Sequence, residues 1–255
     1  MYVVHLTLLP FLAVTGELKT KPTQHSVKTL LESGVQPDIL VCRAEHSIDE
    51  DIRRKLALFT NVRPKNVIES RDASTIYEVP VMMYKEKLDE VVLDYFGLES
   101  KQQPDLDKWL DFLSRLKYPK RTVEIGLIGK YVELKESYKS ITEAFIHAGA
   151  ANEVEVKIRW IHSEHLTEKN AANTCKGLDG VLVAPGFGER GFEGKVATVQ
   201  YARENKIPYF GICYGMQAAV IEYARNVLGY KNANTTEVDP KTDKPVIALM
   251  DEQMH

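Results

Sequence analysis

The stretch Gly211-Ile212-Cys213-Tyr214-Gly215 has the residue types and spacing of a cysteine nucleophile. A short apolar strand pattern leads into it and a helical pattern follows, which is the context of a nucleophile elbow. Glycine on each side permits a tight, strained turn because neither residue carries a Cβ. Cys213 would lie at the tip, facing a helix N-terminus whose dipole and free N–H groups stabilise a thiolate. The alternative is a buried cysteine between packing glycines, and the strand–helix context favours the nucleophile.

A cysteine that attacks an amide also needs an oxyanion hole and a base. The candidate for the hole is the glycine-rich turn Ala184-Pro185-Gly186-Phe187-Gly188, which follows an apolar strand pattern. Its free backbone N–H groups would point at a developing oxyanion beside Cys213, although a tight turn without a ligand is the alternative. Because Pro185 has no N–H, donation must rest on Gly186 or its successors.

No base can be assigned from the sequence. The chain has seven histidines, and none follows the elbow by enough sequence to return to it on a later strand: His5, His25, His46, His147, His162, His165 and His255. His162 and His165 follow the end of a strand pattern and are the candidates for a base. Surface or packing roles are favoured for His147, His162 and His165, and His255 is the last residue, where order is least expected.

A second chemical signal is the run Lys19-Thr20-Lys21-Pro22-Thr23-Gln24. Two lysines flank a threonine, and a proline begins the next helix, where its missing N–H costs least. Ammonium groups, hydroxyls and a helix N-terminus together suit a polyanion such as a chain of phosphates. A solvated basic loop with a helix cap is the alternative, and the pattern alone does not separate the two.

Alternating strand and helix patterns must position these residues, and they predict an α/β protein with mainly parallel sheets. The first part, which opens with a strand expected to be buried, is followed by a linker over 98–121 with one amphipathic helix and then by a second α/β unit. Strands are expected at Val3–Leu9, Asp38–Cys42, Val67–Ser70, Val123–Ile128, Val154–Ile161, Leu178–Val183 and Pro208–Ile212, with a further one beginning in Val246–Met250. Helices are expected at Gln24–Ser33, Asp49–Leu58, Lys85–Phe96, Ser137–Ala148, Val196–Glu204 and Gln217–Asn226.

The composition is that of an ordinary globular protein. The chain has 255 residues, of which 44% are apolar and 27% charged. Its net charge of −3 gives no general attraction to nucleic acid. The apolar start, Met1 to Val14, lacks a basic region and is too short to cross a membrane. Three cysteines leave one unpaired in any disulfide scheme, which favours a reduced, cytoplasmic compartment.

With both motifs considered, the chain resembles the CTP synthase family, glutamine-dependent ligases that aminate UTP to CTP with ATP, over essentially all its residues. The run Lys19–Gln24 is very specific to that family, whereas the Cys213 elbow is shared by all class I glutamine amidotransferases. Other segments that carry the resemblance are Val4–Pro10, Gln36–Arg43, Lys55–Phe59, Gly129–Tyr131, Phe187–Gly191 and Asn232–Glu237. Two local departures are Ala184-Pro185-Gly186 in place of Pro-Gly-Gly and Tyr214 in place of the more usual leucine.

The resemblance implies the fold class and the domains. It implies the C-terminal part of a P-loop-type synthetase domain over 1–97, the linker over 98–121, and the first half of a class I glutamine amidotransferase domain, which is flavodoxin-like, over 122–255. No G-x-x-x-x-G-K-[ST] motif occurs in the chain. The ATP-binding P-loop and the Mg²⁺ carboxylates are therefore expected before Met1, and the histidine and glutamate of the glutaminase triad after His255. The chain is expected to be an internal fragment without turnover of its own.

The resemblance also implies residue roles and partners. Cys213 corresponds to the glutaminase nucleophile, and no metal ligand is expected within this chain. Glutamine binding falls to Gly186, Tyr214, Gly215, Met216, Gln217 and Glu237, whose carboxylate suits the substrate's α-ammonium. UTP or CTP binding falls to Lys19, Thr20, Lys21, Pro22, Thr23, Gln24 and Lys55, and ATP contact to Arg71, Asp72 and Ala73. The implied partners are UTP, CTP, glutamine and ATP with Mg²⁺, in a cytoplasmic homotetramer with no nucleic acid or membrane.

Two other functions remain open from the sequence. One is a free-standing class I amidotransferase or cysteine hydrolase that uses His162 or His165 as its base. The other is a non-catalytic regulator that binds UTP or CTP through Lys19–Gln24.

Overall fold

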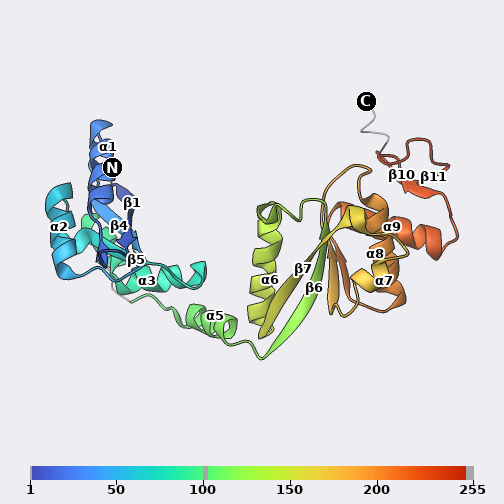
Figure 1. Cartoon of the computed structure of the whole chain (residues 1–255), viewed down its shortest axis with the longest axis horizontal. Coiled ribbons are helices and arrows are strands. Elements are labelled where there is room, and N and C mark those ends of the chain that lie inside the picture. The colour runs from blue at the N-terminus through green and yellow to red at the C-terminus, as the bar shows by residue number, and fades with distance from the viewer. Residues whose placement is uncertain (1, 100–102, 251–255) are drawn as a thin grey trace. The chain divides into compact units, whose positions relative to one another are not determined.

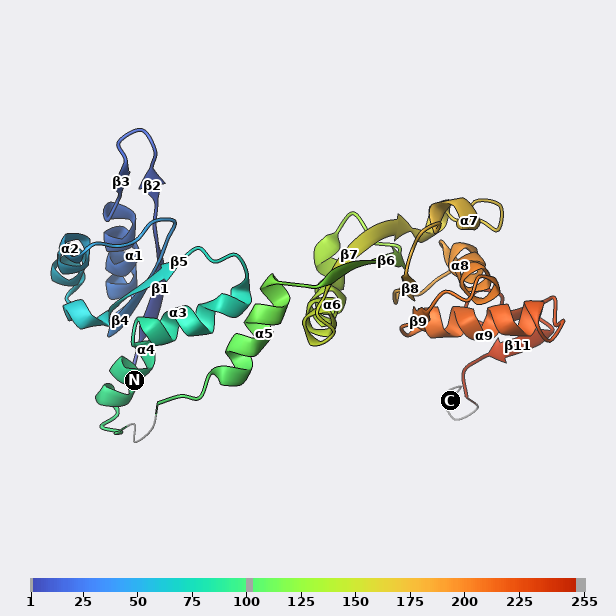
Figure 2. The same ribbon diagram turned by 90° about the horizontal axis from the view of Figure 1, so that it is seen from below.

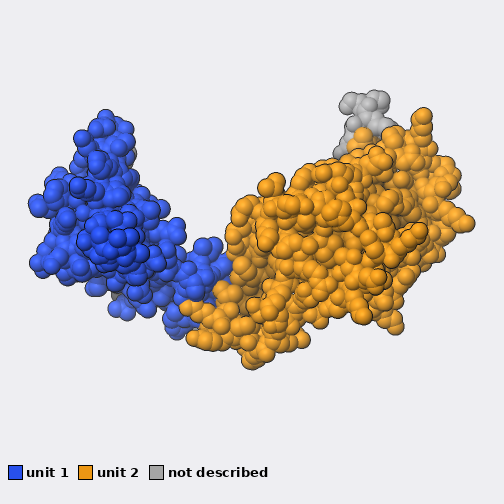
Figure 3. All heavy atoms as spheres, viewed as in Figure 1, with its two compact units in different colours: residues 1–113 blue, residues 114–255 orange. Residues whose placement is uncertain are grey.

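The computed structural model describes residues 2–99 and 103–250 of the chain. The chain forms two compact units, Met1–Leu113 and Ser114–His255, coloured separately in Figure 3. The division falls inside helix α5 (Asp107–Lys117), within the segment predicted as a linker. Residues 100–102 of that linker, as well as His255, lie outside the described residues. Each unit is built around its own parallel sheet (Figure 1).

The first unit contains a three-stranded parallel sheet in the order β1-β4-β5. Its strands are β1 (Val4–Leu9), β4 (Ile39–Ala44) and β5 (Val67–Arg71), which confirms the parallel prediction. Helices α1 (Lys21–Glu32) and α2 (Glu50–Thr60) pack on one face through a core that includes Val27, Leu40 and Leu56. Helices α3 (Val79–Lys85) and α4 (Leu88–Tyr95) cover the other face.

The prediction that the first strand is buried was wrong for one of its faces. Leu6 is 68% exposed and Leu8 55% exposed, whereas Leu9 is fully buried. Successive side chains of a strand point to opposite faces, and β1 is an edge strand. The core on the α3–α4 side is formed by residues of β4, β5 and α4, such as Val41, Ile68 and Val91. The apolar side chains of β1 on that side therefore remain uncovered.

Helix boundaries in the first unit follow local capping chemistry. Helix α1 begins three residues before its predicted start because Pro22 fits the first turn. Asp49 caps α2 by accepting a hydrogen bond from the Ile52 N–H at 2.7 Å. The helix predicted over Lys85–Phe96 is α4, which begins three residues later because Lys87 has a left-handed backbone (φ 60°) that separates it from α3. Helix α3 itself is not among the predicted helices.

A short hairpin leads from β1 to helix α1. It is formed by β2 (Phe11–Leu12) and β3 (Glu17–Leu18), and Figure 2 shows it reaching beyond the sheet. Because β1 runs into this hairpin, the basic run that follows lies at the edge where the parallel strands end. Short 3-10 turns at Pro64–Asn66 and Ile76–Glu78 connect the remaining elements of this unit.

The second unit contains a four-stranded parallel sheet in the order β7-β6-β8-β9. Its strands are β6 (Arg121–Gly129), β7 (Val154–His162), β8 (Gly180–Val183) and β9 (Tyr209–Gly211). In chain order this is 2-1-3-4, the order of the first four strands of a flavodoxin-like sheet. Helix α6 (Lys139–Ala151) lies on one face of the sheet, and α8 (Phe192–Glu204) and α9 (Tyr214–Asn226) on the other (Figure 1).

Smaller elements complete the second unit. They are the 3-10 turns Lys135–Tyr138 and Ser163–His165, the short helix α7 (Ala171–Thr174), and the parallel pair β10 (Ala233–Thr235) and β11 (Lys244–Ile247). Strand β11 ends at Ile247, so the strand predicted to begin in Val246–Met250 is displaced toward the N-terminus. In the described part of the chain, no helix is long and apolar enough to span a membrane.

Candidate functional site

Cys213 lies in a strained turn between β9 and α9. Its backbone angles are φ 54° and ψ −108°, which L-residues rarely adopt. A Cβ on Gly211 would lie 2.5 Å from the Gly215 carbonyl carbon, and a Cβ on Gly215 would overlap the Val183 carbonyl oxygen. Both glycines are therefore required by close backbone approach, and they hold an exposed thiol at the N-terminus of α9. This is the geometry of a nucleophile elbow.

The predicted oxyanion turn lies beside the elbow. Strands β8 and β9 are adjacent, so the loop after β8, residues 184–191, and the turn after β9 share the carboxyl edge of the sheet. Within this loop, Gly186 (φ 130°) and Gly188 (φ 88°) adopt backbone conformations suited to glycine. Among the described residues, the N–H groups of Gly186 and Tyr214 have no hydrogen-bond partner. Free donors therefore occur in both segments that flank the thiol.

Two buried lysines hold the carbonyl groups of this loop. Lys195, on α8, donates from Nζ to the carbonyl oxygens of Ala184 at 2.9 Å and Gly186 at 3.3 Å. Lys130, which follows β6, donates to the carbonyls of Phe187 and, at 3.2 Å, Gly188. Neither lysine is among the residues predicted from the sequence. Two features of the sequence could have indicated them. Lys130 comes directly after a strand pattern expected to be buried, and Lys195 lies within an apolar helix pattern after Gly194.

The environment of these lysines disfavours their charged forms. Burial and the nearby Lys130 ammonium lower the pKa of Lys195 to about 8, and Cys213 acts in the opposite direction. The pKa of Lys130 is lowered by burial and by Arg190, while Glu164 and Glu237 act against this shift. For both lysines, burial disfavours the ammonium form and nearby acidic groups partly offset this effect.

The other residues predicted to bind glutamine lie around the same loop. The Glu237 carboxylate accepts a hydrogen bond from the Gly188 N–H at 2.7 Å, so it contacts the loop that follows β8. Tyr214 is fully buried, its hydroxyl lacks a partner among the described groups, and Lys195 Nζ lies 5.1 Å from its ring centroid. Burial raises the pKa of Tyr214. Met216 is half exposed, whereas Gln217 has a buried side-chain oxygen without a partner in the described structure.

Neither candidate base follows a strand adjacent to β9. His162 is the last residue of β7, which is separated from β9 by β6 and β8. Three strand spacings correspond to about 14 Å, which is far beyond hydrogen-bond reach. His162 instead lies 3.6 Å from Glu133, and its ring stacks on that of His165 with centroids 4.7 Å apart. The sheet order therefore does not support the hydrolase alternative.

In the first unit, the predicted nucleotide residues belong to the segments that follow strands β1, β4 and β5. Lys21 and Pro22 are exposed at the start of α1, and Lys55 is exposed on α2. Lys19 is paired with Glu17 at 2.9 Å. Thr23 is fully buried and donates to the Leu8 carbonyl at 3.0 Å, and Thr20 accepts from Gln24 at 3.1 Å. Thr23 therefore anchors helix α1 to β1, whereas the Thr20–Gln24 bond lies within the start of the helix.

The predicted ATP segment lies at the end of β5. Arg71 is 3.7 Å from Glu69, and Asp72 is bound by Arg43 of the neighbouring strand at 2.7 Å, while Ala73 follows as a partly buried residue. The described residues contain no group of three or more histidine, cysteine, aspartate or glutamate side chains that could hold a metal ion.

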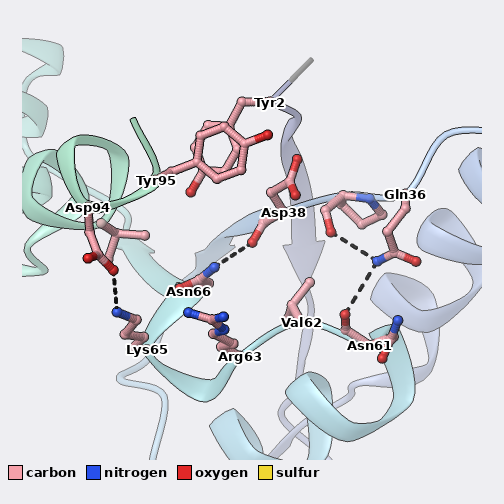
Figure 4. A pocket seen from close by; sticks show the side chains of 12 residues that line it. Tyr2, Gln36, Asp38, Asn61, Val62, Arg63, Lys65, Asn66, Asp94 and Tyr95 are labelled. Atoms are coloured by element: carbon pink, nitrogen blue, oxygen red, sulfur yellow. Dashed lines mark hydrogen bonds and ion pairs between the residues drawn. The ribbon is translucent and has the colours of Figure 1, made fainter. Parts of the chain in front are cut away.

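A cavity of about 430 Å³ lies at the opposite edge of the first sheet. Figure 4 shows its lining, in which Tyr2 stacks on Tyr95 and Lys65 pairs with Asp94 at 2.7 Å. Asn66 donates to the carbonyl of Asp38, near the points where β4 and β5 begin. None of the residues predicted to bind a nucleotide lines this cavity.

Comparison with known proteins finds a matching family for each of the two units. Residues 1–98 match the family described as the CTP synthase N-terminus, and residues 133–250 match the class-I glutamine amidotransferases. Curated CTP synthases of Flavobacterium johnsoniae and Flavobacterium psychrophilum are 62% and 63% identical, over 98% of this chain and 47% of each relative. A solved structure titled as the glutaminase domain of Trypanosoma brucei CTPS with bound acivicin is 42% identical over 51% of this chain and 50% of that one, with a TM-score of 0.48.

The second unit is a class I glutamine amidotransferase domain, as its sheet order, elbow and family match agree. The first unit carries the N-terminal domain type of CTP synthases. The chain belongs to the CTP synthase family, and it spans about half the length of the curated relatives it matches. The predicted family and α/β fold class are thereby confirmed.

Proposed function

We propose that this chain carries the glutamine-hydrolysing centre of a CTP synthase, with Cys213 as its nucleophile. The observation that carries this proposal is the strained backbone of Cys213, which presents an exposed thiol between two segments with free N–H groups. Strain of about 1–3 kcal/mol is retained at functional turns when the surrounding structure enforces it. Here Gly211 and Gly215 enforce it through close backbone approach.

The chemistry of the site follows from these groups. The Cys213 thiolate attacks the carboxamide carbon of glutamine, and the amide oxygen becomes an oxyanion that the N–H groups of Gly186 and Tyr214 stabilise. The carbon–nitrogen bond then breaks as the nitrogen takes up the proton that the thiol lost, so that ammonia leaves. Water hydrolyses the resulting thioester to glutamate and restores the thiol. Glu237, held against the loop by the Gly188 N–H, supplies a carboxylate for the α-ammonium of glutamine.

A chloroketone analogue of glutamine tests this assignment directly. We expect it to alkylate Cys213 at least tenfold faster than iodoacetamide does, because its side chain and ketone oxygen use the glutamine and oxyanion sites. Excess glutamine should slow the reaction, and Cys213→Ser should abolish it. Cys42 and Cys175 serve as internal controls, because both are buried and burial raises the pKa of Cys42 to about 12 and also raises that of Cys175. Peptide mapping that shows no preference of Cys213 for the glutamine analogue would contradict the proposal.

We further propose that the first unit contributes to the UTP site and that the complete protein aminates UTP with the ammonia released from glutamine. Support comes from the match to the CTP synthase N-terminus and from the exposed lysines at the start of α1 and on α2. The roles of Lys19–Gln24 and Lys55 toward UTP or CTP, and of Arg71–Ala73 toward ATP, belong to this proposal. So do the domain limits 1–97, 98–121 and 122–255, the Mg²⁺ requirement, the homotetramer and a cytoplasmic location.

Titration calorimetry tests the nucleotide assignment. We expect UTP and CTP to bind the chain, and Lys21→Met to weaken binding about tenfold, or 1.4 kcal/mol, because it removes an ammonium at the helix N-terminus. The matched control is Lys28→Met, an exposed lysine further along the same helix. Equal affinities of the two variants would contradict the role of Lys21.

A further inference from the structure

Lys195 is a buried charge that the proposed chemistry does not use. Its side chain is completely inaccessible to solvent, yet it extends from the apolar face of α8, where its neighbours Val196 and Val199 belong to the core. Burying an ammonium is costly unless it is fully hydrogen-bonded. The partners of Lys195 are the carbonyl oxygens of Ala184 and Gly186, both in the loop beside Cys213. The hydrogen bonds that offset the burial of Lys195 are therefore made to this loop.

These hydrogen bonds fix the orientation of one peptide group in the loop. In a trans peptide the C=O and N–H groups point in opposite directions. Since the Gly186 carbonyl points at Lys195, the Phe187 N–H must point away from α8. The following peptide is held at both ends, because the Phe187 carbonyl accepts from Lys130 and the Gly188 N–H donates to Glu237. Gly186 lacks a Cβ and adopts φ 130°, so its backbone could also place the Gly186–Phe187 peptide in other orientations. The hydrogen bond from Lys195 to the Gly186 carbonyl disfavours those other orientations.

We propose that Lys195 is a positioning residue of the glutamine-hydrolysing site: by binding the Ala184 and Gly186 carbonyls, its ammonium holds the two peptides that flank the Pro185–Gly186 peptide, so that the Gly186 N–H faces Cys213. This inference rests on the proposed function. It accounts for a fully buried lysine next to the thiol, and it assigns to α8 a direct part in shaping the oxyanion hole.

The charge of Lys195 supplies a pH-dependent readout. The groups that face it are Lys130 at the end of β6, and Cys213 and Tyr214 at the start of α9. Because the pKa of Lys195 is lowered to about 8, the ammonium is present below that pH and lost above it. The neutral amine makes weaker hydrogen bonds to the two carbonyls than the ammonium does, so the loop should loosen as the pH rises through 8.

The experiment measures two alkylation rates of Cys213 in the full chain, in Lys195→Met and in the exposed-lysine control Lys169→Met. The ratio of the glutamine chloroketone rate to the iodoacetamide rate cancels the ionisation of the thiol, because both reagents react with the thiolate. We expect this ratio to fall at least tenfold in Lys195→Met at pH 7, and at least tenfold between pH 7 and 9.5 in the unmodified chain and the control. In Lys195→Met the ratio should not change with pH.

Loop mobility provides a readout that does not depend on glutamine binding. Phe187 is exposed, so chymotrypsin can cut after it when the loop opens. Cleavage at Phe187 should be at least tenfold faster in Lys195→Met than in the control. Unchanged cleavage together with a pH-independent ratio in the unmodified chain would overturn the proposal, and the second result does not require the variant to fold. Faster cleavage without any chloroketone preference in the unmodified chain would instead contradict the proposed function and retain the role of Lys195 in the loop.

Discussion

Gly215→Ala is expected to lower the free energy of unfolding by about 4 kcal/mol or more, or to prevent folding, because a Cβ at this position has no space. It would overlap the carbonyl oxygen of Val183 in β8, which is backbone and cannot rotate aside. That carbonyl also accepts the Ile212 N–H at 3.0 Å, so moving it would break the contact between β8 and the elbow. The Gly215 carbonyl in turn accepts from the Tyr209 hydroxyl at 2.7 Å.

Urea denaturation followed by circular dichroism measures this loss, and Gly177→Ala is the matched control. Gly177 also lies in the second unit, but its left-handed backbone (φ 81°) faces open space. Alanine there should cost only about 1–2 kcal/mol, the cost of the left-handed conformation. If the two variants lose the same stability, the close approach of the elbow to β8 is not what requires glycine at 215.

Cys213→Gly is expected to abolish alkylation by the glutamine chloroketone and at the same time to stabilise the fold relative to Cys213→Ala. Both variants lack the thiol, so chemistry is lost in each. Alanine keeps the strained backbone, which costs about 1–3 kcal/mol, and glycine relieves it. Because glycine loses about 0.5–1 kcal/mol more through the entropy of the unfolded chain, the net gain over alanine should be about 0.5–2 kcal/mol.

Thermal and urea unfolding of the two variants isolates the strain, since they differ only by one methyl group at an exposed position. An alanine variant more stable than the glycine variant by about 0.5–1 kcal/mol would show that the turn holds no strain at Cys213, because only the entropic cost of glycine would then separate them. The proposal that Cys213 is the nucleophile would then lose its main support, which is the strained backbone at this residue.

Local signals in the sequence correctly predicted the tight turn at Cys213, the glycine-rich loop after β8 and most elements. The glycines at 211 and 215 and the turn after Val183 predict their own backbone conformations, because the causes lie within a few residues. Errors occurred where the cause was not local. The apolar pattern of β1 predicts a buried strand, but its edge position leaves Leu6 and Leu8 exposed. Lys87, which separates α3 from α4, is neither glycine nor proline, so the sequence does not mark this helix boundary.

By itself, then, the sequence determined a cysteine elbow beside a glycine-rich loop, a basic run before a helix, and two parallel α/β units. The tertiary structure decided which side chains surround them. Lys130 and Lys195 are 65 residues apart, and they meet beneath one loop because β6 and β8 are adjacent and α8 packs its apolar face behind them. The same sheet order separates His162 from Cys213. Strand order and helix packing arise from long-range burial, which residue spacing along the chain does not specify.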